Sequence, residues 1–223
     1  MTSLSSGNLR TITDTLSLDT LQILSSIDLP ELTFVGELKM SDLPNMQGNS
    51  LLQTLTQLSS LSVINTGLSE LEGFRLETLD TSVITNNPYL NRINLQPYNI
   101  TGGMTISSNG RNLEVSMPNV QVAQNLSFAN CSSISTPSLH QCFGLNVISN
   151  TISEFTGVPL LREINTSLAF VANSEMTRIA LPELRTVSGA FLVANNTKLE
   201  ALDQLYSLAR VDGAVDLQGP LEK

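Results

Sequence analysis

A short phrase recurs about every 22 residues along the whole chain, and this period constrains the fold more than any other feature of the sequence. It reads apolar-x-apolar-x-x-Asn, as in FLVANN from Phe191 and LAFVAN from Leu168. Its last position falls on Leu21, Leu43, Thr66, Asn87, Asn109, Cys131, Asn150, Asn173, Asn196 and Pro220, in steps of 19 to 24 residues. A fixed period of this length indicates a solenoid, in which stacked rungs bury a core that no single rung could bury.

The alternation of two apolar residues predicts a short strand in each rung. We therefore expect an all-β, right-handed parallel β-solenoid of about ten rungs, with one long parallel sheet. The pattern is weakest in the third rung, which ends at Thr66, and in the fourth, where Ser82 takes an apolar place. The expected inward residues are Leu16, Leu18, Leu38, Met40, Ile84, Ile106, Leu126, Phe128, Val147, Leu168, Phe170, Phe191, Val193, Val215 and Leu217.

The Asn position has a chemical explanation. Where the backbone turns a corner, its N–H and C=O groups lose their sheet partners, and an inward amide can both donate and accept. We predict an asparagine ladder made of Asn87, Asn109, Cys131, Asn150, Asn173 and Asn196. Four glycines each stand two residues before a strand, where we expect positive φ: Gly36, Gly102, Gly189 and Gly213.

Composition excludes several classes of function. The 223 residues carry a net charge of −9 without any run of Lys or Arg, so nucleic acid is a poor partner. Apolar stretches are too short to span a membrane. We expect one solenoid domain over residues 1–223. Neither a signal peptide nor an anchor signal is visible, and neither end looks like a polar cap, so we expect a fragment.

Residues that could carry catalysis are sparse, and we expect no enzyme, no cofactor and no metal. His140 is the only histidine, and with two cysteines it does not complete a zinc site. A Cys–His pair with Cys142 is conceivable, but the repeat register points Cys142 inward, where a thiol is usually inert. The carboxylates of Glu70 and Glu72, or of Asp212 and Asp216, find no facing partner for glycoside cleavage.

The two cysteines leave an alternative open. Cys131 and Cys142 could form a disulfide in an oxidising compartment. Cys131 occupies a ladder position, however, and Cys142 lies near the start of the next strand, so their Cα atoms need not come within bonding range. We favour two free, buried thiols.

Five sequons offer possible N-glycosylation, at Asn99, Asn125, Asn130, Asn165 and Asn195. Roughly four are expected by chance, so position matters more than number. Asn130 and Asn195 each stand on an outward place directly before a ladder residue, and Asn99 lies in a polar loop.

The chain resembles the receptor L-domain type of leucine-rich repeat. More narrowly, it is similar to the fungal GPI-anchored cell-wall-organisation proteins, including sporulation-specific members. The stretches that carry this are SSIDLPELTFVGELKMSDLPNM, NNPYLNRINLQPYNIT, LSFANCSSIS and LAFVANSEMTRIALPELRTVSGAF. The resemblance implies a secreted, N-glycosylated, non-enzymatic protein of the cell wall or outer plasma membrane. That family's signal peptide, first rungs, N-terminal cysteine, Ser-rich stalk and anchor signal have no counterpart in this sequence.

Two functions remain open at this point. The first is a structural or interaction protein of the fungal surface, and the alternative is a carbohydrate-binding or carbohydrate-cleaving solenoid. The outward places of the last six rungs contain no Lys, Arg or Glu, and their apolar members suggest a docking face centred on Ile148, Val171 and Leu192. Its partner would be a wall protein, a glycan or a second copy of the chain.

Overall fold

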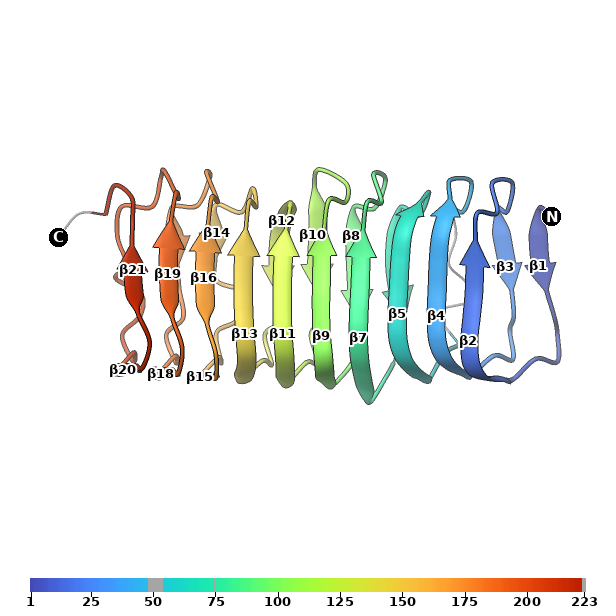
Figure 1. Cartoon of the computed structure of the whole chain (residues 1–223), viewed down its shortest axis with the longest axis horizontal. Helices are drawn as coiled ribbons and strands as arrows, with labels where there is room; N and C mark the ends of the chain where they lie inside the picture. The colour runs from blue at the N-terminus through green and yellow to red at the C-terminus, as the bar shows by residue number, and fades with distance from the viewer. Residues whose placement is uncertain (48–53, 74, 222–223) are drawn as a thin grey trace.

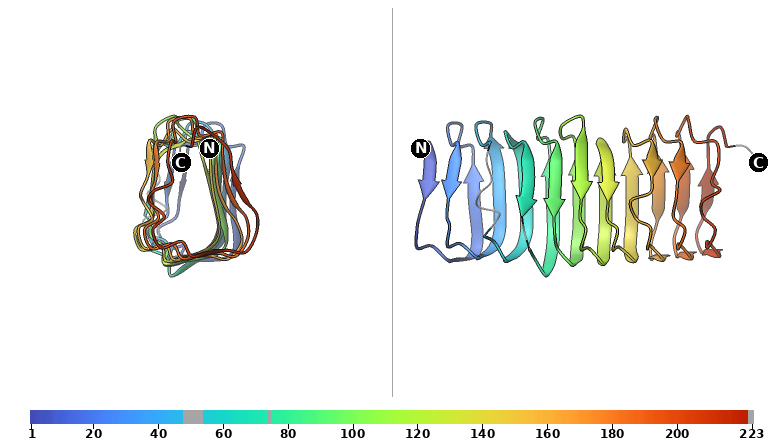
Figure 2. Two further views of the ribbon diagram at one scale, coloured as in Figure 1. Left: turned by 90° about the vertical axis from the view of Figure 1, so that its left-hand side faces the viewer. Right: turned by 180° about the vertical axis from the view of Figure 1, so that it is seen from behind.

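The computed structural model describes residues 1–47, 54–73 and 75–221, and it is a β-solenoid of about nine turns. No helix occurs in these ranges. The chain climbs one face, crosses behind it and descends, while successive turns advance from the N-terminus, which gives a right-handed coil (Figure 1). Seen end-on, the turns superimpose as one closed outline (Figure 2). The predicted fold class is confirmed.

A 13-stranded parallel sheet forms the front of the solenoid. Ten of its strands are those of the repeat phrase, and three short strands lie at the lower corner. Its members are β2 (Thr11–Asp19), β4 (Phe34–Leu43), β5 (Gln57–Thr66), β7 (Thr78–Thr85), β9 (Asn99–Ser107), β11 (Val122–Ala129), β13 (Gln141–Ile148), β15 (Glu163–Ile164), β16 (Leu168–Val171), β18 (Thr186–Val187), β19 (Phe191–Ala194), β20 (Arg210–Val211) and β21 (Val215–Leu217).

Shorter parallel sheets form the back. One contains four strands: β6 (Glu70–Gly73), β8 (Arg92–Leu95), β10 (Leu113–Ser116) and β12 (Cys131–Ser135). Two pairs complete it, β1 (Ser3–Ser5) with β3 (Ser26–Asp28) and β14 (Glu154–Phe155) with β17 (Arg178–Ile179).

The strand register places like residues on like residues. Leu16 pairs with Leu38, and this column continues through Ser82 to Phe191 and Val215. The parallel column runs from Leu18 to Leu217 in the same way. The two weak rungs therefore belong to the repeat, although the Ser82 hydroxyl is buried without a hydrogen-bond partner.

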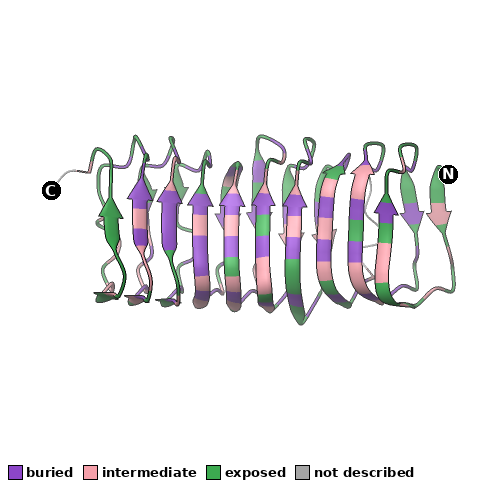
Figure 3. Ribbon diagram, in the orientation of Figure 1, coloured by how far each residue is buried: buried purple, intermediate pink, exposed green. Residues whose placement is uncertain are grey.

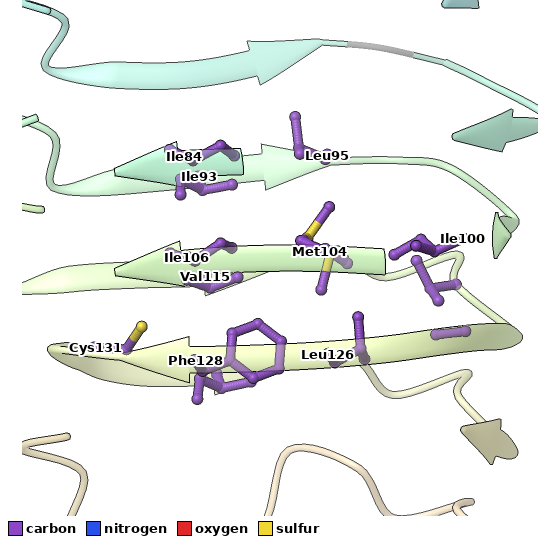
Figure 4. Packing of buried hydrophobic residues seen from close by; sticks show 14 of the residues in the cluster. Ile84, Ile93, Leu95, Ile100, Met104, Ile106, Val115, Leu126, Phe128 and Cys131 are labelled. Carbon is purple, nitrogen blue, oxygen red and sulfur yellow. The ribbon is translucent and has the colours of Figure 1, made fainter. Parts of the chain in front are cut away.

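The core is the continuous stack of these inward side chains. Ile84, Ile106 and Phe128 of the front sheet lie beside Ile93 and Val115 of the back sheet (Figure 4). Each turn buries the apolar face of its neighbours, which no turn could do alone.

Three of the expected inward residues, which lie at the ends of the stack, are not fully buried. Val215 and Leu217 are 53% and 46% exposed, because no described turn covers the far side of β21, and that strand is exposed along its length (Figure 3). Leu16, on the first front strand, is only half-buried for the same reason. The other expected inward residues are buried.

The prediction for the four glycines is wrong. Positive φ among the glycines occurs at Gly73 and Gly219 instead. What requires glycine is close approach between turns: a Cβ on Gly189 would lie 2.1 Å from the carbonyl oxygen of Thr166. Left-handed backbone lies instead at the residue directly before each corner, at Thr20, Asp42, Asn65, Asn86, Ser108, Asn130, Ser149, Ala172 and Asn195.

Candidate functional site

The sheet corners hold buried asparagine side chains that bond from one turn to the next. The Asn173 Oδ1 accepts from the peptide N–H of Asn150 at 2.9 Å, and its Nδ2 donates to the Val147 carbonyl at 2.9 Å. Asn196 Oδ1 accepts from the Asn173 N–H at 2.9 Å. In each case the side-chain oxygen accepts from the peptide N–H at the corner of the preceding turn. The side-chain nitrogen donates to a carbonyl of a preceding strand, so the hydrogen bonds link consecutive turns.

Cys131 interrupts this series. On one side, Asn87 donates to Asn109 Oδ1 at 2.9 Å, and on the other, the Cys131 N–H donates to Asn150 Oδ1 at 2.8 Å. A thiol offers no comparable acceptor. At this corner the next turn contributes the Asn130 Oδ1 instead, which accepts from the Ser108 N–H at 3.4 Å, and Asn109 is half-buried. The predicted ladder residues thus form two hydrogen-bonded groups: Asn87 with Asn109, and the Cys131 N–H with Asn150, Asn173 and Asn196.

Both cysteines are free, buried thiols. The Cys142 sulfur donates to the Gly144 carbonyl at 3.1 Å and contacts the Gln124 carbonyl at 3.5 Å, so it points into the backbone and has no bond to His140. Burial raises the pKa of Cys131 and of Cys142 from 9.0 to about 12. A thiol that stays protonated at neutral pH is a poor nucleophile.

The carboxylates singled out in the sequence do not converge. Glu72 pairs with Arg92 at 3.0 Å, and Asp212 pairs with Arg210 at 2.5 Å, in different parts of the solenoid. Asp216 accepts from the Gln218 amide at 3.0 Å. Across the described ranges, no group of three or more His, Cys, Asp or Glu residues is arranged to hold a metal ion.

An uncharged strip covers the outer surface of the front sheet from β5 to β19. It has two adjacent columns of outward side chains, and charged residues begin again at Lys39 on β4 and Asp216 on β21. Its members are Ser62, Ile64, Val83, Thr85, Thr105, Ser107, Ser127, Ala129, Asn146, Ile148, Ala169, Val171, Leu192 and Ala194.

The three predicted centre residues share this strip. Ile148 pairs with Val171 in the register of β13 and β16, and Leu192 lies on the next strand beside Ala169. Ile148 is 36% exposed, while Val171 and Leu192 are half-buried by their neighbours. Sequence reasoning missed Ile64 and Val83, because the repeat pattern is least regular at those two rungs.

The sequons fall on different parts of the surface. Asn130 and Asn195 are exposed at left-handed corners, with φ of 61° and 58°. Asn125 lies on the front sheet between Gly103 and Gly144 in register. The half-buried Asn165 accepts a 3.4 Å hydrogen bond from Gln141, and Asn99 is half-buried at the start of β9.

No helix long and apolar enough to cross a membrane occurs in the described part of the chain. No protein-family model matches the sequence, and no solved structure matches it.

Curated relatives do match. The chain is 38% identical over 220 residues to a "Cell surface GPI-anchored protein" of Arthroderma benhamiae, covering 98% of this chain and 57% of the relative. It is 36% identical over 195 residues to "Protein ecm33" of Aspergillus fumigatus, covering 86% and 48%. Identity to "Sporulation-specific protein 22" of Saccharomyces cerevisiae is 26% over 216 residues, covering 96% and 46%. The chain spans about half the length of these relatives. Its resemblance to fungal cell-wall-organisation proteins is thus confirmed, and the chain is a homologue of the fungal proteins named Ecm33 and of sporulation-specific protein 22.

Proposed function

We propose that this chain is the repeat domain of a non-enzymatic structural protein that contributes to the organisation and integrity of the fungal cell wall. The observation that carries this proposal is the 38% identity to a cell surface GPI-anchored protein over 98% of the chain, which includes every turn of the solenoid. By the same homology, the protein acts outside the plasma membrane, in the wall or held at the cell surface by a GPI anchor.

The geometry of the domain supports a role in binding other molecules rather than in catalysis. Its core is predominantly apolar, and most of its later corners are joined by hydrogen bonds from asparagine side chains to the neighbouring turn. Such a stack is stiff along its axis, because each turn is held by both neighbours. A rod of this kind presents surfaces at fixed spacing, which suits a structural component of a wall.

We propose the uncharged strip as its contact surface and another wall protein as the occupant. The strip's apolar members are aliphatic, and aliphatic surface packs well against a protein, whereas sugars prefer aromatic rings. Seven strands about 4.8 Å apart span about 30 Å, and two columns are about 12 Å wide, which gives about 350 Å². A stable protein–protein interface usually takes about 800 Å² from each partner, so the strip alone fits a weak or transient contact.

A complementation experiment tests the role and the surface together. The parent protein would be expressed in a fungal strain that lacks it, with growth scored on a wall-binding dye. The Val171→Glu, Leu192→Lys double variant should fail to restore growth, because it places two charges in the contact. The matched control puts the same charges outside the strip, as Ser17→Glu with Gln218→Lys, and should restore growth.

The double variant must keep the far-UV spectrum and melting point of the parent for the comparison to count. If it restores growth as well as the control does, the strip is not the contact surface. If the parent protein itself fails to restore growth although it reaches the surface, the structural role is refuted.

Glycan placement gives a separate test of secretion. Asn130 and Asn195 are exposed at left-handed corners, one residue beyond the last strip positions of their strands, so we propose them as glycan carriers. Asn125 lies beside the strip, where a glycan would cover the contact. Mass spectrometry of peptides from the secreted protein, after glycan trimming, should find Asn130 and Asn195 occupied and Asn125 bare. A glycan found on Asn125 would by itself contradict the proposed contact surface, whatever the state of the other two sites.

A further inference from the structure

A shallow polar groove of about 770 Å³ crosses three turns near the C-terminal end of the described chain. Its lining residues Glu154 and Arg178 belong to β14 and β17. Figure 1 shows β14 behind the front sheet. Glu154 and Arg178 are paired in register, and Ala180 bridges to Gln204 on the following turn. Three turns therefore bring their outward side chains to one place, far from the uncharged strip.

Hydrogen bonds hold the polar groups of this groove in defined directions. The Gln204 Oε1 accepts from Arg178 Nη2 at 2.9 Å and from the Tyr206 hydroxyl at 2.5 Å. Because both donors occupy the oxygen, the carboxamide is oriented and its Nε2 is left to donate to a ligand. The same bond joins the Tyr206 hydroxyl to a lining residue of the groove, although Tyr206 is not itself part of the lining.

The charges of the groove select the ligand class. Its two cations are neutralised, since Arg178 lies 3.8 Å from Glu154, and Lys198 lies 2.5 Å from Glu175. A phosphate or sulfate group therefore meets no unpaired cation. Glu200 and Asp203 form no ion pair among the described residues, so they remain acceptors for hydroxyl donors. A ligand that carries many hydroxyl groups and no charge matches this combination of donors and acceptors.

Tyr206 supplies the remaining feature of such a site. Its side chain is 70% exposed, in a chain without tryptophan. The flat apolar face of a tyrosine ring packs against the C–H face of a pyranose, while its hydroxyl stays hydrogen-bonded. Polar groups with fixed directions beside an exposed aromatic ring are the usual components of a small-ligand site.

We propose that this groove binds an uncharged saccharide, either a terminal sugar or a short segment of a wall polysaccharide. The ring of Tyr206 packs against one sugar face. The sugar hydroxyls donate to Glu200 and Asp203 and accept from the Gln204 Nε2. This contact is separate from the strip and does not depend on the proposed protein partner.

Titration of the full chain with neutral oligosaccharides tests the proposal. The probes are short β-1,3-glucan, chitin and mannan fragments, followed by calorimetry or by NMR shifts. We expect saturable binding of at least one probe, weakened about tenfold by Tyr206→Ala, which corresponds to about 1.4 kcal/mol. Gln204→Ala should weaken binding to a similar degree.

Tyr89→Ala is the matched control, because Tyr89 is similarly exposed at 67% but lines a different hollow with Pro44 and Gly67, whereas the Tyr206 hydroxyl is bonded to Gln204 of the groove. It should leave the affinity unchanged, as should Val171→Glu with Leu192→Lys in the strip. Absence of saturable binding to all three probes would overturn the proposal. So would binding that survives both Tyr206→Ala and Gln204→Ala, or a preference for inorganic phosphate over the neutral sugars.

Discussion

Replacing Asn173 by leucine tests whether the corner amides hold the turns together. The wild-type side chain makes four hydrogen bonds, all with buried partners. Its Oδ1 accepts from the Asn150 N–H at 2.9 Å and from Asn150 Nδ2 at 3.1 Å. Its Nδ2 donates to the Val147 carbonyl at 2.9 Å and to Asn196 Oδ1 at 3.1 Å. Leucine replaces none of these.

The expected loss follows from which groups keep another partner. Asn150 Nδ2 still donates to the Phe128 carbonyl, and Asn196 Oδ1 still accepts from the peptide N–H of residue 173. The Asn150 N–H and the Val147 carbonyl each lose a buried partner, at about 1–3 kcal/mol for each group. Burial of the leucine side chain returns about 1–2 kcal/mol. The net loss in the free energy of unfolding is therefore about 0–5 kcal/mol, centred on about 2.5 kcal/mol.

Urea unfolding followed by circular dichroism measures this loss. Asn91→Leu is the control, because Asn91 is exposed and its side chain makes no hydrogen bond in the described structure, so the change should stay within about 0.5 kcal/mol. Amide exchange adds a directional test. The Asn150 N–H should exchange faster in Asn173→Leu, whereas the N–H of residue 173 should stay protected by Asn196. Equal stability of the two variants would refute the role of the ladder.

Three further predictions concern the cysteines and the backbone. Since burial raises the pKa of Cys131 and Cys142 from 9.0 to about 12, unfolded thiols ionise between these pH values while folded ones stay protonated. The unfolding free energy should therefore fall with rising pH by about 1.4 kcal/mol per unit for each thiol, and a double Cys→Ala variant should lose that part of the slope. Ala172→Gly removes the strain of an alanine side chain in the left-handed conformation, so it should raise the free energy of unfolding by about 0.5 kcal/mol. A loss above about 1 kcal/mol would contradict this. Gly189→Ala should lower it by about 1–3 kcal/mol, measured by the same urea unfolding, because its Cβ would collide with backbone of the neighbouring turn; an unchanged midpoint would show that the turns can separate locally.

The period of the sequence was enough to predict the strand register. A parallel solenoid must bury the same two positions in every turn, so the apolar columns that pass through Phe191 and Val193 could be followed along the chain. One polar residue did not break a column, because the turns on both sides of Ser82 place Leu61 and Met104 against it. One irregular rung therefore does not change the register predicted for the other rungs.

Backbone conformation at the corners could not be predicted as well. Glycine serves both positive φ and close approach, and the sequence does not separate these causes. The left-handed positions carry Asn at four of nine corners and Asp at one, and these residues tolerate that conformation better than most. The dipeptides Asn86-Asn87 and Asn195-Asn196 contained this signal: the first residue adopts the left-handed turn, and the second points inward to the ladder.

The candidate sites were harder to derive for a different reason. Inward positions are fixed by packing and corners by hydrogen bonding, so the period specifies residue types there. Outward positions are constrained neither by core packing nor by corner hydrogen bonds. The period therefore gives their place on the surface but not their function. The strip could be found because its columns follow the period, and it was incomplete where the rungs were irregular. The groove beside Tyr206 depends on a diagonal contact from Arg178 to Gln204, two residues beyond the register partner. A side chain that reaches across the register leaves no periodic signal, so such a site becomes visible only once the turns are stacked.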